Sequence, residues 1–252
     1  MKKIIALFLF GIFFVACADS KHGNDSTSAS EVVLRVGTSA DYPPFEFLDE
    51  KNQISGFDIE LLNAISAKTG IKFDVQNIQF DGLIPALVSG KIDAAISGMS
   101  ATEARRKSVD FSAPYFKTEH LFVSASGAGF KDKSSLDGKR VGAQVGTLQE
   151  SFAKEIPGVV FVPFESTPML FASLKAGKVD ALVTDSSLGF EFINKSNGEI
   201  NEFYSEPDGS DGFAIAFAKD KFKSEISKID AAIKQIKESG EFEKIAKKYN
   251  LN

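Results

Sequence analysis

The chain carries the same helix-to-strand unit twice, and this internal repeat limits the folds open to it more than any other feature. The stretch SGKIDAAISG begins at Ser89, and the stretch AGKVDALVTD begins at Ala176. Both run through Gly-Lys, a β-branched residue and Asp-Ala into an apolar pair that is followed by a hydroxyl side chain. A glycine at the end of a helix, followed by an apolar run, predicts a helix cap and a buried strand. We therefore expect two halves that each contain one such unit.

The polar residues inside the repeat have a structural interpretation. Any unit of this kind needs a glycine cap, and the two lysines do not stand in the GxxxxGK[ST] pattern of a phosphate-binding loop. We predict scaffold roles for the glycines, lysines and aspartates of both copies, which are Gly90, Gly177, Lys91, Lys178, Asp93 and Asp180.

Strand and helix patterns alternate along both halves. In the first half, the predicted strands are VVLRVGTS, IKFDVQNI and IDAAIS, and the predicted helices are GFDIELLNAISAKTG and DGLIPALVSG. The second half repeats this order with strands KRVGAQV, VVFVPF and VDALVT, a helix from Thr147 and a helix in TPMLFASLKAG. A strand FAIAFA and two helices close the chain after Gly212. This order predicts an α/β fold with largely parallel sheets flanked by helices.

The N-terminal stretch MKKIIALFLFGIFFVAC has the pattern of an export signal. Two lysines precede an apolar run that is shorter than the ~20 residues of a membrane-spanning helix. The run leads to Cys17, the single cysteine of the chain, in a context similar to a bacterial lipobox. We expect a signal peptide over 1–16 and a lipidated Cys17 with a polar tether over 17–30, which anchors the protein to a membrane in the periplasm or cell envelope. A plain secretory signal is the alternative.

Charge and residue types exclude several functions. The formal net charge is −5, so a nucleic-acid backbone is not an expected partner. The two histidines, His22 and His120, stand in no metal-ligand spacing and in no Ser/His/Asp arrangement. We expect no cofactor and no metal.

Polar residues gather where the repeated strands end. Ser100 with Glu103, and Thr147 with Glu150, fit the capping-box pattern at two helix starts. Asp185 follows the second repeated strand. Ligands of open α/β sheets bind at the carboxyl ends of the strands, so these positions are candidates for a binding site.

Each candidate also has a purely structural interpretation. Arg105 lies in the charged run EARRK and fits a solvated helix surface. Asp185 precedes two serines and fits a helix cap. Tyr42 and Phe80 fit core aromatics.

Seven motifs, in one order over most of the chain, resemble the extracytoplasmic amino-acid-binding proteins of ABC importers (solute-binding protein family 3). They are GTSADYPPFEF, GFDIELLNAIS, FDGLIPAL, KIDAAISGMSATEARRK, VDFSAPYF, GKRVGAQVGTLQE and AGKVDALVTDSS. The resemblance implies a two-lobed periplasmic-binding-protein fold of type II with two crossover hinge segments. It also implies a monomer that takes up a free L-amino acid and delivers it to an ABC permease in the inner membrane.

The same resemblance implies the extent of the two lobes. Lobe one would comprise 31–117 plus 212–252, and lobe two would comprise 122–206. The hinges would lie near 117–121 and 207–212, and the second segment contains PDGSDG, which independently predicts a loop.

The roles of the pocket residues follow from the resemblance. Arg105 would bind the ligand α-carboxylate, with donors from Ser100 and the backbone at Thr147. Asp185 would accept the α-ammonium, assisted by the Gly98 carbonyl and Ser100. The ligand side chain would lie between two aromatic residues, Tyr42 and Phe80.

The identity of the ligand side chain depends on further positions. Binders of basic amino acids or glutamine commonly have an acid three residues before the pocket aromatic, and Ser39 stands there. Asp41 would point away from the pocket if the segment is extended. SGMSAT and QVGTLQE nevertheless resemble binders of basic amino acids, so we expect an arginine-, lysine- or histidine-like ligand, or another polar one. Further polar contacts would come from Gln144, Gln149, Ser97 and Glu119.

Two other functions use the same fold. One is a periplasmic dehydratase of the cyclohexadienyl type, which needs a general acid beside its substrate. The other is an amino-acid sensor or adhesin. We expect a binding protein and not an enzyme.

Overall fold

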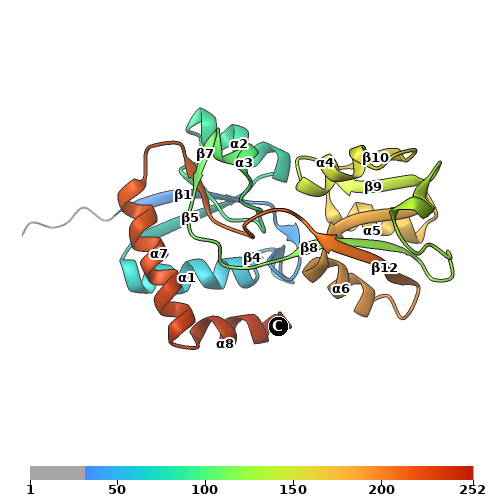
Figure 1. Cartoon of the computed structure of the whole chain (residues 1–252). Helices are drawn as coiled ribbons and strands as arrows, with labels where there is room; N and C mark the ends of the chain where they lie inside the picture. Colours follow the sequence, from blue (N-terminus) through green and yellow to red (C-terminus); the bar gives the residue numbers. More distant parts are fainter. Residues whose placement is uncertain (1–31, 252) are drawn as a thin grey trace, which may run out of the picture. The chain divides into compact units, whose positions relative to one another are not determined.

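The protein consists of two α/β lobes, each built on a five-stranded sheet (Figure 1). The computed structural model describes residues 32–251, so the predicted signal peptide, Cys17 and tether lie outside the described residues. We name the lobes by their sheets: lobe one carries the sheet that includes the first strand, β1 (Val33–Thr38), and lobe two carries the sheet that includes β9 (Arg140–Gln144).

Lobe one contains both the start and the end of the described chain. Its remaining elements are a small antiparallel sheet β2 (Asp41–Tyr42), β3 (Glu46–Leu48) and β4 (Ile54–Ser55), then α1 (Phe57–Thr69), β5 (Lys72–Asn77), α2 (Phe80–Ser89), β6 (Ala94–Ala95), α3 (Glu103–Arg106), β7 (Val109–Phe111), β13 (Ala216–Ala218), α7 (Lys223–Glu238) and α8 (Glu241–Lys248). The sequence patterns did not indicate the small sheet, whose strands have only two or three residues each.

Lobe two is formed by one continuous stretch between these two parts. Its elements are β8 (Glu119–Ala125), a 3₁₀ helix η1 (Lys133–Leu136), β9, α4 (Leu148–Glu155), β10 (Val160–Phe164), α5 (Thr167–Lys175), β11 (Ala181–Asp185), α6 (Ser186–Asn194) and β12 (Ile200–Pro207).

The two main sheets have the same topology. Their strand orders are β5-β1-β6-β13-β7 and β10-β9-β11-β8-β12. In each sheet the first three strands pair in parallel and the fourth is antiparallel to both of its neighbours. Four strands of each sheet therefore share one direction, as the repeated β-α-β pattern predicts. The reversed strand, β13 or β8, is the first strand after the chain enters that lobe from the other one.

The repeat forms the same contacts in both lobes. Asp93 directly precedes β6, and its carboxylate accepts two side-chain hydrogen bonds from Arg35 of β1, the shorter at 2.7 Å. Asp180 precedes β11 and binds Arg140 of β9 in the same way, with the shorter bond at 2.8 Å. Each arginine also donates to the carbonyl of the repeat glycine, Gly90 or Gly177. These bonds tie the turn after the helix to the neighbouring strand.

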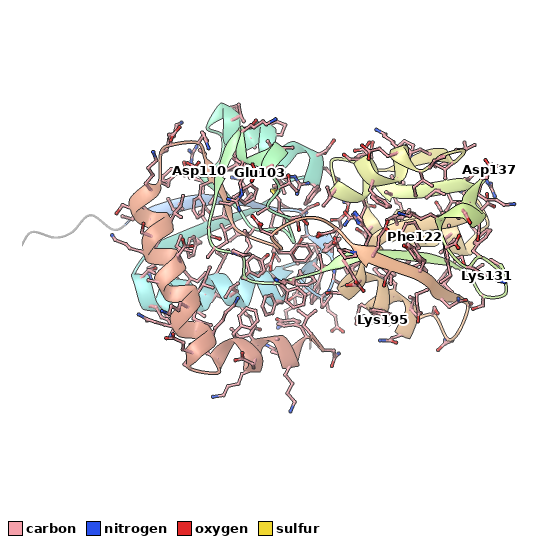
Figure 2. The ribbon with its side chains drawn as sticks, viewed as in Figure 1. Glu103, Asp110, Phe122, Lys131, Asp137 and Lys195 are labelled. Atoms are coloured by element: carbon pink, nitrogen blue, oxygen red, sulfur yellow. The ribbon has the colours of Figure 1, made fainter. Side chains whose placement is uncertain are left out.

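Apolar side chains cover both faces of each sheet. In lobe one, α1 and α7 pack on one face and α2 packs on the other. In lobe two, successive residues of β8 point to opposite faces of the sheet. Leu121 and Val123 pack in the apolar cluster with α5 and α6, and Phe122 packs in the cluster with α4. Figure 2 shows Phe122 inside the lobe. The burial of both faces explains why the central strands are apolar throughout.

None of the helices within residues 32–251 is both long and apolar enough to cross a membrane.

Candidate binding site between the lobes

Asp185 is the last residue of β11, and the fold buries it between the lobes. Its side chain is 4% exposed and accepts hydrogen bonds from the Tyr42 hydroxyl of lobe one and from Gln149 Nε2 at 2.9 Å. Burial raises the pKa of Asp185 to about 7, against the opposing effects of the Tyr42 hydrogen bond and the Arg105 charge. Asp185 occupies the position before α6 but makes no side-chain capping bond there. The carboxylate therefore faces the space between the lobes and does not serve as a helix cap.

Arg105 reaches the same space from lobe one. It lies in the short helix α3, whose cap is Thr102. Its guanidinium donates to the Ser100 carbonyl at 2.8 Å and to the Gly146 carbonyl of lobe two at 2.9 Å. Burial lowers the pKa of Arg105 to about 10, and the charge of Asp185 opposes this shift. Arg105 therefore remains a cation at neutral pH, within electrostatic range of an anion from the other lobe.

One cavity joins these two groups. Its free volume is only about 10 Å³, which is about the space of one water molecule. The lining residues are Tyr42, Phe80, Gly98, Ser100, Arg105, Gln144, Thr147, Leu148, Gln149 and Asp185. Nine of these ten were predicted from the sequence, and they come from both lobes. The Arg105 guanidinium carbon also lies 5.5 Å from the centre of the Phe80 ring, over the ring face.

Three of the predicted residues lie outside the cavity lining. Ser97 is buried behind it, where its hydroxyl accepts from the Ser39 backbone N–H and donates to Glu46. The Ser39 hydroxyl donates to Asp41 at 2.8 Å. Glu119 starts β8 and pairs with Pro207 in the neighbouring strand. The hydroxyls of Ser39 and Ser97 are therefore engaged with the protein.

Asp41 lies outside the cavity lining and faces lobe two. Its carboxylate contacts lobe two, accepting from Gln144 Nε2 and from the Thr167 backbone N–H, both at 3.3 Å. The extended geometry that would turn Asp41 away from Tyr42 applies to a strand, but β2 has only two residues and the chain turns on both sides of it. An acidic group therefore lies beside Gln144 at the edge of the cavity.

The two predicted capping boxes have different outcomes. The helix after Ser100 begins two residues later than expected, because Thr102 accepts the capping bond from the Arg105 backbone N–H. Ser100 instead forms a β-bridge with Phe213 and lines the cavity. Thr147 caps α4 as predicted, and the Glu150 carboxylate accepts from the backbone N–H of Gly146 at 2.7 Å. Both helix starts point polar groups at the cavity.

The sequence patterns missed Leu148 and two buried acids, Glu46 and Asp58. Leu148 follows a cap residue, and its position in the motif QVGTLQE could have indicated it. The acids lie in PPFEF and GFDIE, where an acidic residue that faces a core is indistinguishable by periodicity from one that faces solvent.

A larger hollow lies at the outer end of lobe two, where Figure 2 labels Asp137. It is open to solvent, and its cation, Lys133, is already paired with Glu206 at 2.7 Å. Among the described residues, no cluster of histidine, cysteine and acidic side chains could hold a metal ion. The cavity between the lobes is therefore the candidate site.

Two α/β lobes of identical topology, with a cavity between a cation of one lobe and an anion of the other, define a two-lobed solute-binding protein of the periplasmic type. The sequence agrees with this class. The profile of the bacterial extracellular solute-binding proteins, family 3, matches residues 34–252. The chain belongs to this family.

Relatives and solved structures agree with the assignment. A probable histidine-binding protein of Campylobacter jejuni is 38% identical over 100% of both chains. The arginine-binding extracellular protein ArtP of Bacillus subtilis is 36% identical over 99% of this chain and 98% of the relative. The structure of an ancestral arginine-binding protein bound to arginine superimposes with a TM-score of 0.80 at 39% identity, covering 86% of this chain and 97% of that chain. An arginine-specific periplasmic binding protein of Salmonella typhimurium gives a TM-score of 0.81 at 31% identity, covering 86% and 99%. These relatives are named as binding proteins.

Proposed function

We propose that the protein binds a free L-amino acid between its lobes and delivers it to an ABC permease for uptake. The observation that carries the proposal is the placement of Arg105 and Asp185, from opposite lobes, at one cavity. An amino acid is a zwitterion, so its two charges need one fixed cation and one fixed anion a few ångströms apart. Arg105 binds the α-carboxylate, with donors from Ser100 and the start of α4 at Thr147. Asp185 accepts the α-ammonium with help from the Gly98 carbonyl and Ser100.

In the structure each of these two charged groups has neutral hydrogen-bond partners from the protein. Arg105 donates to Gly146, and Asp185 accepts from Tyr42 and Gln149. An amino-acid ligand replaces the neutral partner of Arg105 with a carboxylate and the neutral partners of Asp185 with an ammonium group. Hydrogen bonds between opposite charges are stronger than those to neutral groups. Closure is favoured because neither lobe satisfies both ends of the ligand by itself.

The ligand class that the site supports best is a basic L-amino acid of the arginine, lysine or histidine type. The side chain lies between Tyr42 and Phe80, and Gln144 and Gln149 offer amides along the cavity. Asp41 adds an anion at the Gln144 end, where burial raises its pKa above the ordinary value. A cationic side chain placed there relieves the cost of a buried unpaired carboxylate. The names of the relatives point to the same class.

Titration calorimetry with single amino acids tests this proposal. We expect arginine, lysine or histidine to bind with a Kd below about 10 µM, and aspartate and D-arginine to show no heat. The variant Asp41→Asn should weaken the binding of arginine more than the binding of glutamine. Strong binding of an acidic amino acid contradicts the assignment. A panel in which no amino acid binds contradicts it as well. Incubation with prephenate or arogenate should leave both compounds unchanged, because turnover would indicate a dehydratase.

The proposal also covers the N-terminal segment, the extent of the two lobes and the hinges between them. We propose a cleaved signal over 1–16, a lipid on Cys17, a tether over 17–30 and a monomer held at a membrane. Lobe one comprises 31–117 with 212–252, and lobe two comprises 122–206. The start of β8 at Glu119 and the end of β12 at Pro207 support hinges near 117–121 and 207–212. Mass spectrometry of the membrane fraction tests the lipid on Cys17.

A further inference from the structure

Glu46 and Asp58 form a buried acid pair behind the wall of the cavity. Glu46 lies in β3 and Asp58 in the first turn of α1, and both residues are 0% exposed. Among the described residues, the groups that shift the pKa of either carboxyl include no lysine, arginine or histidine. Two buried carboxylates without a cation repel each other and lose their hydration. The pair therefore requires another way to reduce its charge.

The hydrogen bonds show where a proton would lie. Asp58 Oδ2 accepts from the Gly98 backbone N–H at 3.0 Å and from the Tyr115 hydroxyl at 2.9 Å. Glu46 Oε1 accepts from the Ser97 hydroxyl at 2.9 Å. The other two oxygens, Glu46 Oε2 and Asp58 Oδ1, have no donor among the described residues. The two carboxyls interact directly with each other, and two carboxylates form a hydrogen bond only if one of them is protonated.

We propose that Glu46 and Asp58 hold one proton between them and together position Ser97 and Gly98. Gly98 lines the cavity, and Ser97 lies directly behind it. Asp58 fixes Gly98, which lines the cavity, through its backbone N–H. Glu46 fixes Ser97, whose hydroxyl also accepts from the Ser39 backbone at 2.9 Å. The role in ligand binding rests on the proposed function, whereas the shared proton does not.

The electrostatic surroundings assign the proton to Glu46. Burial raises the pKa of Glu46 well above its ordinary value and the pKa of Asp58 to about 6. Asp58 accepts two further hydrogen bonds that favour its ionised form, whereas Glu46 accepts one. The other titratable groups that face the pair are Asp41, Tyr42 and Tyr115. All are acids, so none supplies a positive charge.

The variant Glu46→Gln isolates the proton. A glutamine amide donates to Asp58 and its carbonyl accepts from Ser97, so every hydrogen bond is kept without a titrating group. Infrared spectra at pH 8, where Asp185 is ionised, should show a protonated-carboxyl band in the wild type that is missing in Glu46→Gln. The exposed Glu202→Gln variant is the control and should retain the band. A wild type without the band overturns the shared proton.

The pH dependence of unfolding gives a second readout. Glu46 is ionised in the unfolded chain above about pH 4 and protonated in the fold, so folding takes up one proton and stability falls as pH rises. Between pH 5 and 8 the unfolding constant of the wild type should rise about tenfold per pH unit more steeply than that of Glu46→Gln. Equal slopes for the two proteins contradict the proposal.

The positioning role needs a variant that breaks the bonds. Glu46→Leu keeps the volume but leaves Ser97 and Asp58 without this partner. We expect faster hydrogen exchange across residues 96–99 and at least tenfold weaker amino-acid binding in Glu46→Leu, with wild-type values of both in Glu46→Gln. Unchanged exchange in a folded Glu46→Leu variant overturns the positioning role. If Glu46→Leu does not fold, Ser97→Ala breaks the same link and should show the same two changes. If no amino acid binds the wild type, the proposed function fails, while the infrared and exchange results still decide this inference.

Discussion

At the scale of single residues, the site depends on two charges that the fold has removed from water. Arg105 has a lowered pKa and Asp185 has a raised pKa because each is buried, and each charge partly offsets the shift of the other. Exposed ion pairs contribute little, whereas truncating one partner of a buried pair is costly because the other charge is left unpaired. These two residues therefore offer the sharpest tests of the proposed function.

Replacing Arg105→Ala should lower the affinity for a basic amino acid at least 100-fold, which corresponds to ~3 kcal/mol, because the α-carboxylate loses its cation. The matched control is Arg106→Ala, the next residue of the same helix. Arg106 pairs with Asp211 at the surface at 2.8 Å, so its loss should change affinity less than threefold. Calorimetry measures both, and circular dichroism checks that both variants are folded. Similar affinities for the two variants would contradict the role of Arg105.

Binding should depend on pH through Asp185. Burial raises its pKa to about 7, and an ammonium ligand binds the ionised form. Below pH 7 binding must first release a proton, so affinity should fall toward tenfold per pH unit and reach a plateau above pH 7. Asp185→Asn should weaken binding by at least 100-fold, and the weak binding that remains should not change between pH 5 and 8. A wild-type affinity that stays constant from pH 5 to 8 would refute this assignment.

At the scale of elements, one β-α-β-α-β unit is used twice, and the ends of its third strand carry different chemistry. Arg35 with Asp93, and Arg140 with Asp180, hold the unit together in the same way in each lobe. After β6 the chain turns through Gly98 toward Arg105, whereas β11 ends directly on Asp185. The scaffold is repeated because each wall of the cavity needs a strand end at the same edge of its sheet.

The turn after β6 leaves little room at Gly98. Its φ of 49° lies in the left-handed region, and a Cβ there would lie 3.1 Å from the Tyr42 ring. Gly98→Ala should therefore destabilise the protein by ~2 kcal/mol and weaken ligand binding by displacing Tyr42. Gly198→Ala is the matched control, because its φ is 80° but nothing lies within 4 Å of the added Cβ. It should cost only ~1 kcal/mol, as denaturant unfolding can measure, and should leave affinity unchanged. Equal effects of the two substitutions would show that contact with Tyr42 is unimportant.

At the scale of the whole molecule, the cavity between the lobes links the stability of the protein to the ligand. Tyr42 with Asp185, Arg105 with Gly146, and Asp41 with Gln144 join lobe one to lobe two. A ligand that contacts both lobes in addition binds the closed state more tightly than any open one. The folded state is stabilised in proportion.

Addition of the proper amino acid at ~1,000 times its Kd should stabilise the protein by ~4 kcal/mol, or roughly 8–16 °C in Tm. Differential scanning calorimetry measures the shift. Arg105→Ala should abolish it while its ligand-free Tm stays near that of the wild type. A shift of the same size in that variant would place the ligand elsewhere.

Much of the fold could be predicted from the sequence because its signals are local. Glycine caps, apolar runs and their alternation identified the repeated units, and the polar residues at the strand ends identified most of the cavity. The helix start at Thr102 was placed two residues early, because Ser100 and Thr102 both offer a hydroxyl that can cap. Local patterns could not distinguish them, since the bridge from Ser100 to Phe213 joins distant segments.

The sequence by itself determined the repeated scaffold, the family and the residues at the ends of its strands. Only the tertiary structure decided which side chains meet across the cavity and which groups lose their water. Asp41 turns toward Gln144 because a short strand lies against the other lobe, and Glu46 and Asp58 face each other because α1 packs against β3. Desolvation and contacts between distant residues depend on how the whole chain packs, so no local pattern records them.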